Sequence, residues 1–277
     1  MYGKGKDADL QSRPRRLKAK AGAVVRSPKT HEVRKAIREL RLFFIEAAFL
    51  VGLMIIYWLI RGAIPERTAD AFARARQIIH LEQSLGFFWE SGWQEQIIGN
   101  RTLVDVANGI YLYGHLPILI LGGIWIYMRS RERYRTYRNA LLISACVGLL
   151  VYGLFPVAPP RLMPELGFVD TIAMFNNKSN TMQPSYIVNH YAAVPSYHFG
   201  WALLIGIALI DISRNLWVRA FAILFPTLMF FSIVLTANHF IFDAVIGGLF
   251  VLLAIGLAFA LDNFRFGTRQ ALRGSSG

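Results

Sequence analysis

The sequence is short of both cysteine and charge. Only one of its 277 residues is a cysteine, so an intramolecular disulfide framework and a multi-cysteine metal site are excluded. Charged residues make up 17%, whereas a soluble domain carries roughly 25%. With 55% hydrophobic residues, the chain cannot cover a water-facing surface, which indicates an integral membrane protein. We expect Cys146, which lies in an apolar run, to be a small buried packing residue.

The net charge of +13 is concentrated at the N-terminus. Residues 1–41 hold 13 Lys and Arg against four Asp and Glu, and the other 236 residues carry only +4. A basic tail before apolar runs is typical of a cytoplasmic membrane flank and argues against nucleic-acid binding. We expect a disordered basic cytoplasmic tail over 1–30, a single membrane domain over 31–265 and a second cytoplasmic tail over 266–277.

Apolar runs predict the fold, because a helix needs about 20 apolar residues to cross a bilayer. Six runs approach this length, at about 42–60, 104–127, 139–156, 197–212, 216–236 and 239–261. Residues 62–100 mix Arg, Glu and Gln with apolar and aromatic residues, which predicts amphipathic helices at the membrane surface. The expected fold is all-α, a six-span transmembrane bundle with surface helices between spans one and two.

The positive charges predict the orientation. With both termini in the cytoplasm, 23 of the 30 Lys and Arg lie on the inner side. The segment 129–138 alone contributes five of them. We therefore expect a multi-pass protein of the plasma membrane whose loop 157–195 and turn 237–243 both lie outside.

Three polar clusters fall at the outer ends of the predicted spans. They contain Arg161, then Ser196 with His198, then His239 with Asp243. Arginine offers a permanent forked charge to phosphate oxygens. Two histidines, a serine and an aspartate on the same membrane face complete a candidate phosphate site.

Spacing supports this chemistry. His239 and Asp243 are four residues apart, hence on one face of a helix. A carboxylate there holds one imidazole nitrogen as N–H and leaves the other as a lone-pair nucleophile. Ser196 and His198 follow Pro195, which we take as an early helical residue, and the N–H groups of a helix N-terminus favour an anion.

The two motifs resemble the type-2 phosphatidic acid phosphatase superfamily. They are Pro195-Ser196-x-His198 and, about forty residues later, His239-x-x-x-Asp243. The sequences of segments 155–161 (FPVAPPR) and 194–201 (VPSYHFGW) are most similar to the branch of inositol phosphorylceramide synthases, inositolphosphotransferase-like enzymes and their bacterial relatives. The motif-bearing part is about 150–250, and the six-span layout extends the resemblance to most of the chain.

The resemblance implies a role for each motif residue. His239 is the nucleophile that forms a phosphohistidine, and Asp243 orients it. His198 protonates the leaving alkoxide and then acts as base for the incoming hydroxyl. Arg161 and Ser196 hold phosphate oxygens. Neither a metal nor another cofactor is expected.

Three positions depart from the superfamily pattern. Leu154 and Leu162 stand where its first motif has lysine and proline, and Ile233 stands where its third motif has arginine. Bound phosphate must therefore obtain positive charge elsewhere. Lys178 is the only lysine after residue 35, lies in the predicted outer loop, and is a candidate.

The second predicted span carries a polar stripe. Asn108, Tyr111 and His115 are spaced i, i+3 and i+7, which places them on one helical face. Polar residues within a span normally face the bundle interior. The stripe either lines the site and a substrate groove or forms an interhelical hydrogen-bond network.

These patterns predict a membrane-embedded enzyme acting on a lipid phosphate at the outer membrane face. It passes a phosphoryl group or phospho-headgroup to water or to a polyol or lipid hydroxyl, with inositol-phosphate-type transfer slightly favoured. The alternative is a plain lipid-phosphate or polyprenyl-(pyro)phosphate phosphatase. An alternative of another class is a non-catalytic lipid-binding or transport protein.

Overall fold

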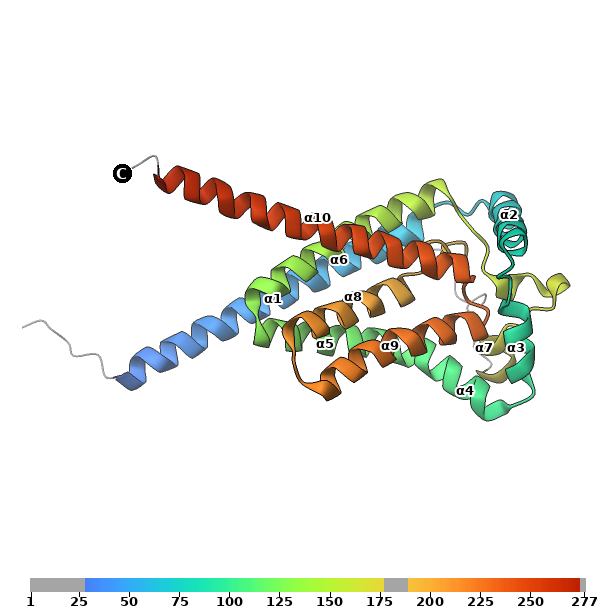
Figure 1. Ribbon diagram of the computed structural model, residues 1–277, viewed down its shortest axis with the longest axis horizontal. Coiled ribbons are helices and arrows are strands. Elements are labelled where there is room, and N and C mark those ends of the chain that lie inside the picture. The colour runs from blue at the N-terminus through green and yellow to red at the C-terminus, as the bar shows by residue number, and fades with distance from the viewer. Residues whose placement is uncertain (1–27, 177–188, 275–277) are drawn as a thin grey trace, which may run out of the picture. The chain divides into compact units, whose positions relative to one another are not determined.

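A computed structural model describes residues 28–176 and 189–274 (Figure 1). The chain divides into two units, Met1–Met54 and Ile55–Gly277. In the described part of the first unit, helix α1 (Pro28–Ala63) begins, and its last residues belong to the second unit.

The second unit is helical, which confirms the predicted all-α class. Its longer helices are α2 (Thr68–Leu85), α5 (His115–Arg129), α6 (Arg131–Leu154), α8 (Tyr197–Ile212), α9 (Leu216–Leu235) and α10 (Ile241–Gly274). Its shorter elements are α3 (Glu90–Ile98), α4 (Arg101–Gly109), the π-helical turn η1 (Ile110–Gly114), the 3-10 turns η2 (Pro160–Leu162) and η3 (Pro164–Leu166), and α7 (Thr171–Asn176). Within the described ranges, the only β-type pairing is one isolated bridge, Val157 with Ala192.

Five stretches of helix in the described residues are long and apolar enough to cross a membrane. They are Glu32–Ala63, Arg101–Arg129, Arg131–Leu154, Leu216–Leu235 and Ile241–Phe264. The remaining predicted span is α8, which is apolar but has 16 residues. At 1.5 Å per residue it covers about 24 Å, short of the ~30 Å hydrocarbon layer. The described residues thus indicate a multi-pass membrane protein with five candidate spans, and the predicted count of six is not confirmed.

Helix α8 is the centre of the unit and packs against α5, α6, α9 and α10. Figure 1 shows α8 lying between α6 and α9. Glycines allow two of these contacts, because a Cβ on Gly206 would strike the carbonyl oxygen of Ala222, and one on Gly247 would strike that of Ser196. Small residues let helix backbones approach closely where lipid provides no hydrophobic drive.

One end of the bundle collects the polar motifs. At this end α6 and α9 finish while α8 and α10 begin, and α2, α3 and α7 lie beside it (Figure 1). The residues between 62 and 100 do form helices, α2 and α3, as expected. The bridge between Val157 and Ala192 joins the segment after α6 to the segment before α8, with the Val157 N–H donating to Tyr191 O at 2.8 Å.

Cys146 corrects an expectation, because it is exposed rather than buried. Ser144 and Ala145 precede it on α6 and are both buried. A helix turns by about 100° per residue, which carries Cys146 off the packed face. An apolar run in a membrane helix therefore does not show which side faces protein.

Candidate active site

His239 lies directly before α10 and is held through one ring nitrogen. Its Nδ1 lies 2.9 Å from the carbonyl oxygen of Ala193 and 3.3 Å from Oδ2 of Asp243. A carbonyl and a carboxylate only accept hydrogen bonds, so this network assigns the proton to Nδ1 and leaves the lone pair on Nε2. His239 is 6% exposed and Asp243 is fully buried. These two acceptors thus hold the ring with its proton on Nδ1.

A tight turn between α9 and α10 presents His239. Ala237 in this turn has φ 53°, a left-handed conformation that a residue with a side chain rarely adopts. The N–H groups of Asn238 and His239 both donate to Ile233 O, at 3.0 and 3.1 Å. The carbonyl of Ala237 accepts from the N–H of Arg161 at 2.7 Å. Hydrogen bonds on both sides of Ala237 thus hold the strained turn in place.

His198 lies in the first turn of α8, next to His239. The centroids of the two rings are 5.8 Å apart. Two more rings flank His198: that of Tyr111 in η1, with its centroid at 4.5 Å, and that of His115 at the start of α5, at 4.8 Å. Folding thus brings together two histidines that are far apart in sequence.

Ser196 occupies the N-cap position of α8 in an extended conformation, and its side chain makes no capping bond. Helix α8 begins at Tyr197, so Pro195 lies before the helix rather than within its first turn. The N–H of Ser196 donates to the carbonyl of Asp243 at 3.0 Å, which ties the start of α8 to the first turn of α10. Its Oγ is buried without a hydrogen-bond partner in the described residues and can donate to an oxyanion.

Arg161 follows α6 in η2 and is 9% exposed. Its backbone contact with Ala237 places it beside the turn that carries His239. Its Nε lies 3.6 Å from Oδ2 of Asp170, so a carboxylate already balances part of its charge. Arg161 is therefore close to the turn that carries His239, but it is not a fully free cation.

The polar stripe of the second span divides. Tyr111 and His115 lie against His198, at a π-helical turn, and such turns are frequent at functional sites. Asn108 instead pairs with Thr171: its Nδ2 donates to the Thr171 carbonyl at 3.2 Å, and the Thr171 hydroxyl donates back to Oδ1 at 2.8 Å. The structure thus places two members of the stripe beside the histidines and the third in a buried bond with α7.

Two buried glutamates, which the sequence analysis did not identify, close the N-terminus of α10. Oε1 of Glu90 accepts from the N–H of Ile241, and Oε1 of Glu82 accepts from that of Phe242, both at 2.8 Å. Neither glutamate is exposed. Burial, together with the neighbouring Glu90 carboxyl, raises the pKa of Glu82 to about 9, and burial also raises the pKa of Glu90.

A sequence signal for Glu82 existed. It follows Ala71, Ala75 and Ile78 at spacings of three and four residues, and all four are buried on one face of α2. An acid in register with an apolar face is a buried-acid candidate. What it caps came only from the fold, because Phe242 lies 160 positions away.

Arg61 was also unassigned by sequence. Its guanidinium carbon lies 5.3 Å from the centroid of the Tyr152 ring and 5.9 Å from that of Trp58. The Tyr152 hydroxyl donates to the carbonyl of Pro195 at 3.0 Å, just before Ser196. Arg61 thus stands one side chain away from the start of α8.

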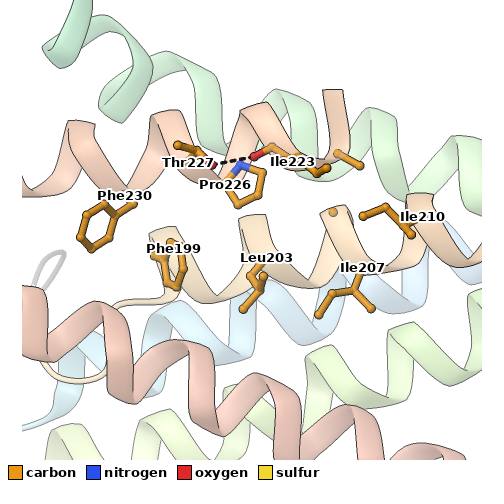
Figure 2. A pocket seen from close by; sticks show the side chains of 10 residues that line it. Phe199, Leu203, Ile207, Ile210, Ile223, Pro226, Thr227 and Phe230 are labelled. Atoms are coloured by element: carbon orange, nitrogen blue, oxygen red, sulfur yellow. Dashed lines mark hydrogen bonds between the residues drawn. The ribbon is translucent and has the colours of Figure 1, made fainter. Parts of the chain in front are cut away.

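An apolar groove of about 330 Å³ runs between α8 and α9. It is lined by Phe199, Leu203, Ile207 and Ile210 of α8 and by Ile223, Pro226 and Phe230 of α9 (Figure 2). Thr227 adds no free hydroxyl, since its Oγ1 donates to the carbonyl of Ile223 at 2.8 Å. Phe199, the residue after His198, lines the groove, but neither His198 nor His239 does.

Lys178, the remaining candidate, lies outside the described residues. In the described part of the chain, no group of three or more His, Cys, Asp or Glu side chains is placed to hold a metal ion. The predicted absence of a metal cofactor stays a prediction.

A sequence model of the PAP2 superfamily matches residues 76–258, about two thirds of the chain. The protein belongs to the PAP2 superfamily. Searches of curated proteins and of solved structures gave no match. Family membership supports a phosphatase-type enzyme that acts on a membrane lipid phosphate. It confirms the superfamily expected from the motifs, whereas the inositol phosphorylceramide synthase branch is not confirmed.

Proposed function

We propose that this PAP2 protein transfers a phosphoryl group or phospho-headgroup through a phosphohistidine on His239. One observation carries the proposal: Nδ1 of His239 lies between two acceptors, Ala193 O and Asp243, which leaves the lone pair of Nε2 unused. An imidazole oriented by a carboxylate is an activated nucleophile.

The proposed reaction has two displacements at phosphorus. In the first, Nε2 of His239 attacks, the P–O bond to the leaving group breaks, and His198 gives a proton to the leaving oxygen. In the second, the acceptor hydroxyl gives its proton to His198, its oxygen attacks phosphorus, and the P–N bond breaks. After the first step His198 is neutral and can accept a proton, and after the second step His198 is protonated again and His239 is free.

Phosphate oxygens are held, in this proposal, by Ser196 and Arg161, with Lys178 as a weaker candidate. The buried, unpartnered Oγ of Ser196 supports its role. Tyr111 and His115, beside His198, line the substrate side of the site. The apolar groove that starts at Phe199 is suited to a lipid rather than a water-soluble phosphoester (Figure 2).

The acceptor decides the class of reaction. Water makes the protein a lipid-phosphate or polyprenyl-(pyro)phosphate phosphatase, and a polyol such as inositol makes it a headgroup transferase. We favour the transferase slightly, because the sequences of segments 155–161 and 194–201 are similar to those of the inositol phosphorylceramide synthase branch. The positive-inside pattern further supports a plasma-membrane protein with cytoplasmic termini and a site facing outward.

The test uses purified full-length protein in phosphatidylcholine vesicles with EDTA present. Phosphatidic acid and phosphatidylinositol are supplied in turn, with and without labelled inositol or diacylglycerol as acceptor. Phosphate release alone identifies a phosphatase, and label in a new phospholipid identifies a transferase. Absence of both, with folded protein and either lipid, would favour the non-catalytic alternative. Activity that strictly requires an added divalent ion would contradict the histidine nucleophile.

A further inference from the structure

Arg61 stands beside the start of α8, at the same end of the bundle as the histidines. Its guanidinium lies on the ring of Tyr152, whose hydroxyl bonds the carbonyl of Pro195. The N–H of Arg161 donates to the carbonyl of Ala237, two residues before His239, at 2.7 Å. Two arginines therefore approach the wall of the site from different elements, α1 and η2.

Arg61 differs from the neighbouring arginines in having no counter-ion. Arg161 pairs with Asp170 and Arg67 with Asp70, whereas no carboxylate of the described residues lies within ion-pair distance of Arg61. Its Nε is buried and has no hydrogen-bond partner there. The undescribed segment 177–188 contains no Asp or Glu.

Arg61 lies in the last turn of α1, and a buried guanidinium nitrogen without a hydrogen-bond partner is costly there unless a ligand pairs with it. A phosphate monoester carries about −1.5 to −2 charges at neutral pH. Asp243 adds negative charge beside His239, and Asp170 takes up part of the charge of Arg161. A further cation would therefore help to balance the charge of a bound phosphate.

We propose that Arg61 is a phosphate-binding residue, whose guanidinium supplies the second positive charge to a phosphate group placed beside His239 and His198. The proposal rests on the proposed function for the location of the phosphate. It assigns the charge to α1, which lies outside the part of the chain that matches the family, residues 76–258. Arg61 thereby takes the part for which the sequence analysis considered Lys178.

The test measures orthovanadate binding to purified full-length protein in nanodiscs by isothermal titration calorimetry. Vanadate reproduces the shape of the phosphoryl-transfer transition state. Loss of a charge-assisted contact predicts about 10- to 100-fold weaker binding in Arg61→Gln. Arg74→Gln is the matched control, because Arg74 also lies on an aromatic ring, that of Phe155 at 4.5 Å, and donates to a carbonyl, that of Leu154 at 3.0 Å.

A charge-rescue experiment separates phosphate binding from packing on Tyr152. Arg61→Cys is made in a Cys146→Ser background and modified with either an ethylammonium or a neutral methyl thiosulfonate reagent. The cationic adduct should recover most of the vanadate affinity and the neutral one should not. This comparison uses one folded protein, so it decides the case even if Arg61→Gln folds poorly.

The outcomes separate the two proposals. Wild-type vanadate affinity in Arg61→Gln, or equal affinity of the two adducts, overturns the role of Arg61 and leaves the proposed function intact. Weakening by Lys178→Gln but not by Arg61→Gln does the same and returns the role to Lys178. Arg61-dependent vanadate binding without any turnover supports the role of Arg61 and overturns the proposed reaction. A wild-type protein that binds no vanadate overturns both.

Discussion

His239 illustrates how much one residue depends on its contacts. The i, i+4 spacing to Asp243 predicts a contact with the carboxylate, which is found at 3.3 Å, but α10 begins at Ile241, so His239 lies in the turn before the helix and not on its face. The closer acceptor, the Ala193 carbonyl at 2.9 Å, comes from a segment 46 positions away. Sequence therefore predicts that the ring is oriented, but only the fold supplies the second acceptor that fixes the tautomer.

We expect His239→Ala to lower turnover by several orders of magnitude while leaving the protein folded, because it removes the nucleophile. The measurement is the initial rate of phosphate release or headgroup transfer, with circular dichroism as the folding check. His80→Ala, at an exposed position on α2, is the matched control and should behave as wild type. Near-normal activity in well-folded His239→Ala would sink the proposed mechanism.

His198→Ala should reveal a general acid through its dependence on the leaving group. For a lipid alkoxide, loss of the acid should cost about 10²- to 10⁴-fold. With p-nitrophenyl phosphate, whose leaving group needs little protonation, the loss should be much smaller. The ratio of the two rate losses is the measurement. Equal losses with both substrates would assign His198 to positioning rather than to proton transfer.

At the scale of elements, the start of α10 is the junction of the site. Its first N–H groups are bonded by Glu90 and Glu82 from two other helices, and the N–H of Phe240 is bonded by Asp243 at 3.0 Å. These are the donors that a helix leaves unpaired at its N-terminus. The element that carries Asp243 is thus held by α2 and α3.

The buried carboxyls predict how stability depends on pH. The pKa of Glu82 is raised to about 9 in the folded protein, whereas an unfolded chain has an ordinary glutamate. The folded state therefore binds more protons, and the free energy of unfolding should fall as pH rises from about 4.5 to about 9. Glu82→Gln stays neutral and should flatten this part of the profile.

The measurement is the midpoint of thermal unfolding in detergent between pH 5 and pH 9. Glu95→Gln, at an exposed position on α3, is the matched control and should keep the wild-type slope. A Glu82→Gln profile that is parallel to wild type would show that Glu82 is ionised in the folded protein.

At the scale of the whole molecule, α6 is long enough to place its two ends on opposite sides of the membrane. Its 24 residues extend about 36 Å, enough to cross the ~30 Å hydrocarbon layer. Glu132 lies in its first turn and Glu165 lies in η3, after its end, and both are exposed. The two glutamates are therefore suited to report opposite sides.

We expect Glu165→Cys to react with an impermeant maleimide in intact cells and Glu132→Cys to react only after lysis, because the basic segment 129–138 should be cytoplasmic. Both variants need a Cys146→Ser background, since Cys146 is exposed. Gel-shift labelling is the measurement. The reverse pattern would move His239 to the cytoplasmic side, together with the lipid leaflet that it serves.

The sequence by itself determined the all-α membrane class, the helical ranges and the superfamily, because each depends on local information. Runs of apolar residues predict helices in a bilayer whatever their neighbours are. The spacing of residues within each motif likewise does not depend on how the helices pack. The predicted run 197–212 matches α8, but the place of Pro195 was not local: Ser196 takes an extended N-cap conformation, bonded to Asp243, so Pro195 lies before the helix.

Only the tertiary structure decided the surroundings of the site. Glu82, Glu90 and Arg61 precede the motif-bearing part of the chain and carry no motif, yet they lie at the starts of α10 and α8. The same holds for Asn108, which shares the stripe of Tyr111 and His115 but bonds to Thr171. A buried charge or amide takes its role from partners far along the chain, and only the fold brings them within bonding distance.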